Sequence, residues 1–564
     1  MRYRSAVLGA ATALALVAGQ GLAGAAGGDP LERFYGQAVD WQECQDPVLP
    51  EPPEGGIIID PWAGLWHLMD CALVTVPVNY RDPAGGTFRI EVSRLRATDP
   101  ARRRGVLLLN PGGPGGGGLS MPLGAREMEI AKHFDLIGFQ PRGVGDASAL
   151  TCEVVTDTRP HTSRPTDEQF ALYTAYARAR EDACQRAGGA NRPYINSANT
   201  ARDMDVIRAI LGERKINYLG YSYGTYLGAV YGSLFPARLH RSVLDSSVHP
   251  GWLWREQGLQ QSVGVRFNVD EWAAWAGDRD ATYHLGASRE EVLEATEALA
   301  ARLADHAVPL TIDRPEGWPA YWPRQIDRSE LDRFLAVSAQ TRPIWDVIAE
   351  VIGELRRAAE DGSALSADAG AAVGALREPP QVDSGVYETV TCEADWPADL
   401  DTYYRDMRSY RDRYPYWDFN GSGVVGAAPT TCTFRSFTPP EPLVPLARHG
   451  YPAGLVIQAD GDPATQYRGG PAMAAALDDR LITVRDSGEH GHFGANACVD
   501  AAVNAYLING VLPSPGAECA AAPRPDVPAG VSADMSADAA PGVTKEQRVR
   551  AGTERRSIWQ PPRA

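Results

Sequence analysis

Residues 216–224 read Ile216-Asn217-Tyr218-Leu219-Gly220-Tyr221-Ser222-Tyr223-Gly224, an apolar run that leads directly into a G-x-S-x-G motif, and a helix-compatible stretch follows from Tyr226. The order strand, motif, helix is typical of a sharp turn that holds the central serine on a strained elbow with its hydroxyl exposed. Ser222 is therefore a candidate nucleophile. Because the pattern also occurs by chance, this interpretation depends on an oxyanion hole upstream and on an acid and a histidine downstream.

A glycine-rich stretch that follows the apolar run at 105–109 is the candidate oxyanion hole. It reads Asn110-Pro111-Gly112-Gly113-Pro114-Gly115-Gly116-Gly117-Gly118. Acyl transfer needs two backbone N–H groups aimed at the developing oxyanion, and glycines let the main chain approach closely. Pro114 has no N–H, so we predict Gly113 as one donor and Tyr223, next after the nucleophile, as the other. A phosphate-binding loop is the alternative, but the stretch lacks the Gly-Lys-Ser/Thr ending.

The catalytic acid is expected in the loop after the next-to-last strand. There the apolar run at 453–457 continues into Gln458-Ala459-Asp460-Gly461-Asp462-Pro463, which offers Asp460 and Asp462. We favour Asp462 as the acid. Both aspartates could instead serve only as turn residues, because Asp-Gly and Asp-Pro are common in polar turns.

The catalytic histidine is expected after the last strand, which is predicted at 481–484. The chain continues there with Asp486-Ser487-Gly488-Glu489-His490-Gly491-His492. We predict His490 as the base and keep His492 as the alternative. In the predicted mechanism His490 accepts the Ser222 proton, Asp462 holds the imidazole tautomer, and water hydrolyses the acyl-enzyme.

Short apolar runs separated by helical patterns predict an α/β fold with a mostly parallel central sheet. The predicted strands are 71–80, 88–97, 105–109, 134–139, 216–219, 241–245, 453–457 and 481–484, and a helix is predicted at 203–211. The segment between the predicted strands 241–245 and 453–457 carries helical patterns at 290–303 and 344–358. Because so long a segment is not a structureless loop in a compact domain, we predict a mainly helical lid insertion.

The predicted organisation has five parts. They are a signal peptide at 1–25, the first part of the core at 26–249, the lid at 250–445, the second part of the core at 446–519, and a disordered tail at 520–564. The tail is predicted to be disordered because it has few large apolar residues and cannot bury enough surface to offset chain entropy.

The N-terminus predicts a secreted, extracellular protein. Basic residues at 2 and 4 precede a small and apolar stretch at 6–18, and Ala23-Gly24-Ala25 fits a cleavage site, so the mature chain is expected to begin near Ala26. No later segment has the apolar length needed to span a membrane. Lys+Arg 54 against Asp+Glu 71 gives a net charge of −17, which argues against a nucleic-acid partner.

Eight cysteines fit the same compartment, since an even number in an exported chain most often forms disulfides. Shorter loops cost less entropy to close, which favours the pairs Cys44 with Cys71, Cys152 with Cys184, Cys392 with Cys432, and Cys498 with Cys519. Free buried thiols are one alternative. A zinc site is another, but no pair has the C-x₂₋₄-C spacing.

Taken together, these motifs resemble the exported α/β-hydrolases related to prolyl iminopeptidase, and specifically the secreted tripeptidyl aminopeptidase-like serine peptidases. The resemblance extends from about residue 44 to residue 519. It rests on the glycine-rich stretch at 110–115, Pro141-Arg142-Gly143-Val144-Gly145, the Ser222 motif, Asp462-Pro463, Gly488-Glu489-His490-Gly491 and the closing stretch at 498–519. Pro111 stands where prolyl iminopeptidases usually have histidine, and Gln140 where relatives commonly have aspartate, which favours the tripeptidyl or broader aminopeptidase branch.

The resemblance implies an α/β-hydrolase fold and exopeptidase action on peptides with a free N-terminus, whose ammonium would pair with acidic lid residues. Near Cys392 the chain offers Glu388, Glu393 and Asp395 for that role, although such residues are more often solvated surface charges. The substrate-binding residues stay open.

Two other functions remain open from the sequence. A carboxylesterase or lipase would use the same triad, because the fold does not determine the substrate. A non-catalytic binding protein on the same scaffold is the alternative from another class. No pattern requires a metal or an organic cofactor, and the sequence leaves the oligomeric state undetermined.

Overall fold

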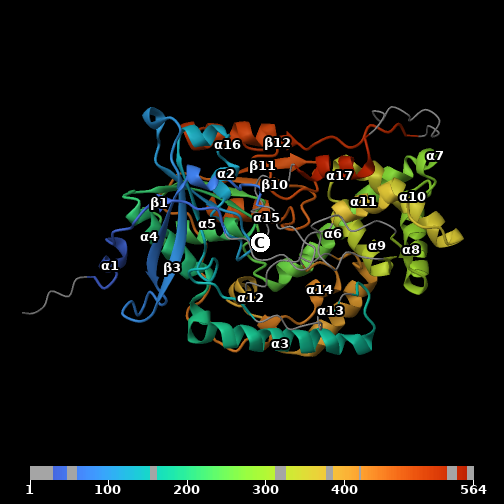
Figure 1. The fold of residues 1–564 in the computed structure, drawn as a ribbon, viewed down its shortest axis with the longest axis horizontal. Coiled ribbons are helices and arrows are strands. Elements are labelled where there is room, and N and C mark those ends of the chain that lie inside the picture. The colour runs from blue at the N-terminus through green and yellow to red at the C-terminus, as the bar shows by residue number, and fades with distance from the viewer. Residues whose placement is uncertain are drawn as a thin grey trace, which may run out of the picture.

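A computed structural model describes residues 29–47, 60–152, 160, 162–310, 325–376, 385–417, 421–529 and 543–554 of the chain. The predicted signal peptide at 1–25 lies outside these residues. Figure 1 shows a central sheet with flanking helices on one side of the molecule and a mainly helical part beside it.

The central sheet has ten strands in the order β1-β2-β3-β5-β4-β6-β7-β10-β11-β12. The strands are β1 (Gln42–Glu43), β2 (Asp70–Pro77), β3 (Thr87–Leu95), β4 (Val106–Asn110), β5 (Asp135–Phe139), β6 (Ile216–Tyr221), β7 (Leu239–Asp245), β10 (Leu455–Ala459), β11 (Arg480–Arg485) and β12 (Ala517–Ala520). From β5 to β12 all neighbours are parallel, and β1, β2 and β3 form an antiparallel end. The predicted mostly parallel sheet is confirmed, whereas β1 and β12 have no counterpart among the predicted strands.

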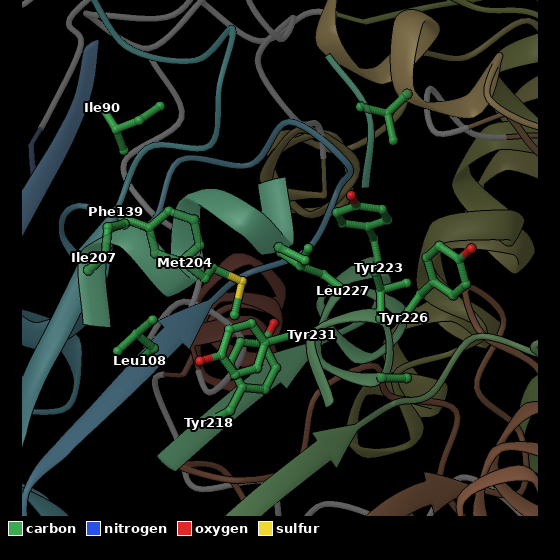
Figure 2. Close-up of a cluster of buried hydrophobic side chains, with 14 of the residues drawn as sticks. Ile90, Leu108, Phe139, Met204, Ile207, Tyr218, Tyr223, Tyr226, Leu227 and Tyr231 are labelled. Atoms are coloured by element: carbon green, nitrogen blue, oxygen red, sulfur yellow. The ribbon is translucent and has the colours of Figure 1, made fainter. Parts of the chain in front are cut away.

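Helices cover both faces of the sheet. They are α1 (Glu32–Tyr35), α4 (Ser197–Ile210), α5 (Tyr223–Leu234) and α15 (Gly469–Leu477) on one face, and α2 (Met121–Gly124) and α16 (Ala497–Asn509) on the other. Strand β4 is buried throughout because Leu108 belongs to the first core cluster while Leu107 and Leu109 belong to the second. Figure 2 shows part of the first cluster, where Met204 of α4, Tyr218 of β6 and Tyr231 of α5 gather.

The described residues between β7 and β10 form a helical cap. It comprises α6 (Arg255–Gly277), α7 (Asp280–Tyr283), α8 (Arg289–Asp305), α9 (Arg328–Ser338), α10 (Trp345–Asp361), α11 (Ala367–Ala375), α12 (Val386–Thr391), α13 (Leu400–Arg413) and α14 (Val424–Ala427), with a short two-stranded pairing of β8 (Val308–Pro309) and β9 (Gln325–Ile326). Helix α10 illustrates why these segments are helical. Its apolar residues Val347, Val351 and Leu355 recur every four positions and are buried, and Gly362 ends the helix in a left-handed conformation.

Helix α3 (Phe170–Gly188) belongs spatially to the cap, although it precedes Ser222 in the chain. Its residues Phe170 and Tyr173 share a buried cluster with Leu259 of α6 and Met407 of α13. Figure 1 shows α3 running along the side of the molecule that α13 and α14 occupy. The helical layer over the sheet is therefore built from two separate parts of the sequence.

The C-terminal helix α17 (Lys545–Glu554) lies beside α11, which places part of the predicted disordered tail on the cap (Figure 1). Val549 is fully buried there. Lys545 lies 3.1 Å from Glu354, and Arg548 lies 3.0 Å from Glu350. Residues 545–554 of the stretch predicted to be disordered thus form a helix that contacts the cap through one buried valine and ion pairs, although the segment has no apolar run of its own.

Four disulfides join the predicted cysteine pairs. They are Cys44–Cys71, Cys152–Cys184, Cys392–Cys432 and Cys498–Cys519. The predicted pairing is confirmed, and the described residues include no free cysteine. The second of these bonds ties α3 to the loop that follows β5, and the fourth ties β12 to α16.

Candidate active site

Ser222 occupies the single-residue turn between β6 and α5. Its backbone has φ 56° and ψ −126°, a left-handed conformation that costs a non-glycine residue about 1–3 kcal/mol. The conformation is held on both sides, because the Ser222 N–H donates to the Asp245 carbonyl at 3.0 Å and the Thr225 N–H donates to the Ser222 carbonyl at 2.9 Å. This is the strained elbow that the G-x-S-x-G motif predicts.

The glycine-rich loop after β4 lies directly against this turn. Gly112 has φ +97°, and a Cβ at Gly112 would lie 2.8 Å from the Ser222 Cβ and 3.1 Å from the Tyr223 nitrogen. Only glycine permits such an approach. The Gly112 N–H donates to the Asn110 side chain at 3.0 Å. Within the described part of the chain the N–H groups of Gly113 and Tyr223 meet no protein acceptor.

The acid loop follows β10, and Asp462 is its buried carboxylate, with 1% of its surface exposed. One oxygen accepts the backbone N–H groups of Ala464 and Thr465, both at 2.9 Å, and the other accepts the Thr465 hydroxyl at 2.8 Å. Burial by itself would raise the pKa of Asp462. The charge of His490 and the hydrogen bonds from His490 and Thr465 outweigh burial and hold that pKa below its usual range.

His490 follows β11, and its Nδ1 lies 2.9 Å from the Asp462 carboxylate. This contact leaves Nε2 as the ring nitrogen that can exchange a proton with a nucleophile. The His490 side chain is 29% exposed, whereas that of Asp462 is buried. Of the two histidines considered in the sequence, the structure brings His490 and not His492 to the acid, since His492 is buried and its ring has no such contact.

The two candidate aspartates of the acid loop have different partners. The Asp460 carboxylate accepts the backbone N–H groups of Asp486 and Ser487 at 2.9 and 3.1 Å. Asp460 therefore joins the acid loop to the histidine loop, while Asp462 contacts the histidine side chain itself.

Sheet order explains why the loops that carry Ser222, Asp462 and His490 lie at one edge of the sheet. Strands β6, β7, β10 and β11 are consecutive and parallel in the sheet, so their carboxyl ends share one edge. Ser222 follows β6, Asp462 follows β10 and His490 follows β11. The histidine loop also touches the serine turn, because the Tyr221 hydroxyl donates to the Phe493 carbonyl at 3.0 Å.

Asp245 and Ser246, at the end of β7, were not among the predicted site residues. One Asp245 oxygen accepts the N–H groups of His492 and Phe493 at 3.0 and 2.7 Å, and the Ser246 hydroxyl accepts the Gly491 N–H at 2.8 Å. Asp245 and Ser246 together thus bind the three successive backbone N–H groups that follow His490. The signal in the sequence is a carboxylate at the carboxyl end of an apolar strand next to the nucleophile strand.

The acidic residues near Cys392 lie in three different environments. Glu388 lies 3.2 Å from Arg180, and Asp395 is exposed. Glu393 accepts the backbone N–H of Ser197 at 2.8 Å and the Ser197 hydroxyl at 2.7 Å. Burial raises the pKa of Glu393 to about 7, although both hydrogen bonds act to lower it.

A small cavity adjoins Glu393. Its lining includes Ser197, Tyr226, Val230 and Phe437 as well as Glu393. The Ser197 hydroxyl also lies 2.9 Å from the hydroxyl of Tyr223, the residue next to the nucleophile. Glu393 is therefore two hydrogen bonds from the helix that begins at the serine turn.

Neither a metal cluster nor a membrane-spanning helix is found among the described residues. They contain no group of three or more His, Cys, Asp or Glu side chains that could hold a metal ion. No helix among them combines the length and the apolar character that crossing a membrane requires.

Comparisons with known proteins give the family. A model described as "alpha/beta hydrolase fold" matches residues 105–328, and one described as "TAP-like protein" matches residues 420–519. The tripeptidyl aminopeptidase of Streptomyces lividans is 34% identical over 508 residues, which cover 86% of this chain and 88% of that protein. The chain belongs to the tripeptidyl aminopeptidase-like family of α/β-hydrolases.

Two further proteins are similar along most of their length. The serine protease Hip1 of Mycobacterium tuberculosis is 28% identical over 513 residues, covering 86% of this chain and 92% of that protein. A protein from the same species named carboxylesterase B is 30% identical over 473 residues, covering 80% of this chain and 86% of that protein. Membership of the tripeptidyl aminopeptidase-like family confirms the predicted α/β-hydrolase fold and makes the protein a serine hydrolase.

Proposed function

We propose that the protein is a secreted serine aminopeptidase that releases short peptides from the free N-terminus of its substrate, as the name of its Streptomyces relative implies. The observation that carries the proposal is the 2.9 Å contact between His490 and the buried Asp462, at the sheet edge where Ser222 occupies its strained turn. The roles of these residues follow from that geometry.

In the proposed mechanism His490 Nε2 takes the proton of the Ser222 hydroxyl while the serine oxygen attacks the scissile carbonyl carbon. The Asp462 carboxylate, bound to Nδ1, stabilises the imidazolium that forms. Collapse of the tetrahedral intermediate breaks the C–N bond, and His490 returns the proton to the departing amine. Water then attacks the acyl-enzyme with the same base, which releases the N-terminal peptide and restores Ser222.

The oxyanion is assigned to the N–H groups of Gly113 and Tyr223. Two observations support this: Gly112 brings the glycine-rich loop against Ser222, and Tyr223 is the first residue of α5. The first N–H groups of a helix have no partner within the helix and favour negative charge. A tetrahedral intermediate on Ser222 would meet donors from both segments.

Selection of a free N-terminus is assigned to Glu393. Among the three acidic residues near Cys392, Glu388 already pairs with Arg180 and Asp395 faces solvent. Glu393 is the one that adjoins a cavity, and its raised pKa marks a carboxylate that lacks a cationic partner. A substrate ammonium would supply that partner and stabilise the ionised form.

A carboxylesterase is the second candidate, and the similarity to the protein named carboxylesterase B favours it. The same serine, histidine and aspartate would hydrolyse an ester, because the acyl-enzyme step does not depend on the leaving group being an amine. The two functions differ in whether a free amine on the substrate is required.

Export is the last part of the proposal. Four disulfides support an oxidising compartment, and the basic and apolar N-terminal segment supports a signal peptide. If the full chain is expressed in a secreting bacterial host, N-terminal sequencing of protein from the medium should begin near Ala26. Protein retained inside the cell with an uncleaved N-terminus would count against export.

One experiment separates the functions. Chromogenic tripeptide anilides with free and with acetylated N-termini, and short acyl esters, are offered to the wild type and to Ser222→Ala. Turnover of the free-amine anilides alone supports the aminopeptidase, and turnover of esters alone supports the esterase. If neither turnover nor labelling by a fluorophosphonate depends on Ser222, the protein is a binding protein on this scaffold and the proposed mechanism fails.

A further inference from the structure

Helix α6 of the cap carries a stripe of residues that faces the acid loop. The stripe consists of Gln257, Gln261, Gly264 and Asn268, which are spaced by four, three and four positions. That spacing places them on one side of an α-helix. Figure 1 shows α6 between the central sheet and the outer cap helices α8 and α10, in the position to contact both.

The C-terminal half of the stripe contacts the loop on both sides of the catalytic acid. Asn268 is fully buried, and its Nδ2 donates to the Gly461 carbonyl at 2.8 Å. Gly264 lies against Pro463, since a Cβ at Gly264 would be 2.9 Å from the Pro463 Cα. Asp462 is the residue between these two contact points.

The N-terminal half of the stripe contacts the end of the same loop. Gln257 Nε2 donates to the Ala464 carbonyl at 2.9 Å and lies 3.0 Å from the Gln466 side-chain oxygen. Gln261 Nε2 donates to the same Ala464 carbonyl at 3.1 Å. Helix and loop therefore run in opposite directions. The side chains of the helix hold the loop by donating to the backbone carbonyls of the loop.

Arg342 determines which way the Asn268 amide points. Arg342 Nη1 donates to Asn268 Oδ1 at 2.6 Å, and the arginine is itself buried. Because a guanidinium can only donate, the atom that it contacts must be the amide oxygen, and the NH₂ group is then directed to Gly461. The cap thus supplies a donor of known orientation to the loop that bears the acid.

The acid loop passes this support to the histidine loop. The Gly461 N–H donates to the Ser487 carbonyl at 2.8 Å, so both backbone polar groups of Gly461 are held: the cap binds its carbonyl, and the loop that leads to His490 accepts its N–H. A shift at Gly461 would move Asp462 and would also release Ser487. Gly461 therefore adds to the link that Asp460 makes between the two loops, and it is the point at which the cap reaches that link.

We propose that Asn268 is a positioning residue for the catalytic acid, so that the cap completes the alignment of Asp462 with His490 and does more than cover the substrate. This inference rests on the proposed function of Asp462 and His490. Asn268 touches no reacting atom and acts through the Gly461 carbonyl.

The test is the isosteric variant Asn268→Asp. The new carboxylate keeps the shape of the side chain and pairs with Arg342, but it has no N–H for Gly461 and places an oxygen against the carbonyl. Because a misplacement of about 1 Å can cost about 100-fold in rate, we expect kcat to fall by about 10- to 100-fold while KM changes little. Gln260→Ala is the matched control, since Gln260 lies on the same helix and its side chain donates to the exposed Glu256 rather than to the acid loop.

A pH–rate profile separates positioning from loss of structure. A displaced Asp462 stabilises the His490 imidazolium less, so the acidic limb of the profile of Asn268→Asp should move to lower pH. Asp460, Asp486 and Glu489 of the two loops and Arg342 of the cap are the same in both proteins. The carboxylate that the substitution adds lies against Arg342, and its charge alone would move the limb to higher pH, so a shift to lower pH reports the displacement of Asp462. A slower variant whose acidic limb coincides with that of the wild type would overturn the proposal, because a structural defect lowers the rate without moving the limb.

Fluorophosphonate labelling distinguishes failure of this inference from failure of the proposed function. If wild-type Ser222 is not labelled, the proposed function fails. If the wild type is labelled and Asn268→Asp is labelled at the same rate, the positioning role is wrong. Should Asn268→Asp not fold, Gln261→Ala removes one outer donor of the same stripe. This variant should show a smaller fall in kcat, and its acidic limb should move in the same direction, to lower pH. An unchanged kcat and limb in that variant would overturn the proposal.

Discussion

The Nδ1 atom of His490 lies 2.9 Å from an Asp462 oxygen although 28 positions separate the two residues in the chain. Both belong to loops that leave adjacent parallel strands, β10 and β11, and the acid is buried while the histidine is partly exposed. A fixed, dry carboxylate behind a reachable imidazole is the arrangement that general-base activation of a serine requires.

The first prediction concerns the two histidines. His490→Ala should lower kcat by about 10⁵- to 10⁶-fold, because no other base holds the serine proton. His492→Gln should retain most of its activity, since the backbone N–H that Asp245 binds remains in place. Steady-state kinetics on a free tripeptide anilide measure both. A His492 variant as inactive as the His490 variant would reverse the assignment.

The second prediction compares the two aspartates of the acid loop. Asp462→Asn should lower kcat by about 10⁴-fold, because an amide facing Nδ1 favours the wrong imidazole tautomer. Asp460→Asn keeps an acceptor for the loop backbone and should lose far less. Equal losses in the two variants would contradict the assignment of Asp462 as the partner of the imidazole.

The third prediction concerns Glu393 and pH. Its pKa is raised to about 7, so the carboxylate is populated only as the pH rises through 7. A peptide α-amino group loses its charge near pH 8. KM for free-amine peptides should therefore fall from pH 6 to about 7.5 and rise again above about 8, whereas KM for esters should not follow this pattern.

Glu393→Gln tests the same point by substitution. Loss of a charged partner worth about 1.5–3 kcal/mol should raise KM for free-amine peptides by about 10- to 100-fold and abolish its fall between pH 6 and 7.5. Glu388→Gln, which alters a carboxylate already paired with Arg180, is the matched control. An unchanged KM in Glu393→Gln would remove this residue from substrate recognition.

The fourth prediction concerns Arg142, a residue of the Pro-Arg-Gly motif. Arg142 is fully buried and donates to Asp203 at 2.6 and 2.8 Å and to the Val78 carbonyl at 2.9 Å. Asp203→Ala leaves this guanidinium buried without its counter-charge and should lower the free energy of unfolding by about 3–5 kcal/mol. Denaturant unfolding with the disulfides intact measures it.

Lys132→Ala provides the comparison for that measurement. It removes an exposed ion pair with Glu129 and should leave the unfolding midpoint almost unchanged. If the two variants unfold at the same denaturant concentration, the Arg142 ion pair does not stabilise the core, and the motif has another role.

Much of the fold could be predicted because its strands are buried on both faces. Runs such as Val106 to Leu109 have no polar residue, so their pattern is specific for the centre of a parallel sheet. Strand β12 could not be predicted, because its four residues are ordered by their pairing with β11 and by the Cys498–Cys519 bond. The disulfide is predicted from the cysteines, but the pairing with β11 is not contained in the local sequence.

The candidate site also has a part that the sequence predicts and a part that it does not. Ser222 lies in a G-x-S-x-G motif and the oxyanion loop in a glycine-rich stretch, and both patterns are typical of this kind of site. The loops that carry Asp462 and His490 each follow a predicted strand. The sequence favours Asp462 over Asp460 although both suit a turn, and in the structure it is Asp462 that contacts the His490 ring. The α6 stripe could not be found from sequence, because its glutamines and asparagine gain meaning only from backbone carbonyls about 200 residues away, as in the 193-residue separation of Asn268 and Gly461.

The docking of α17 has a consequence for the order in which the molecule is completed. Lys545 binds Asp368 across 177 positions, and Arg548 binds Asp346 across 202. A ribosome makes those acidic partners first, so the side of α11 that α17 covers stays bare until residues 545–554 have been synthesised. Export of a still unfolded precursor would avoid that exposed intermediate, whereas slow release in a reducing cytosol would prolong it.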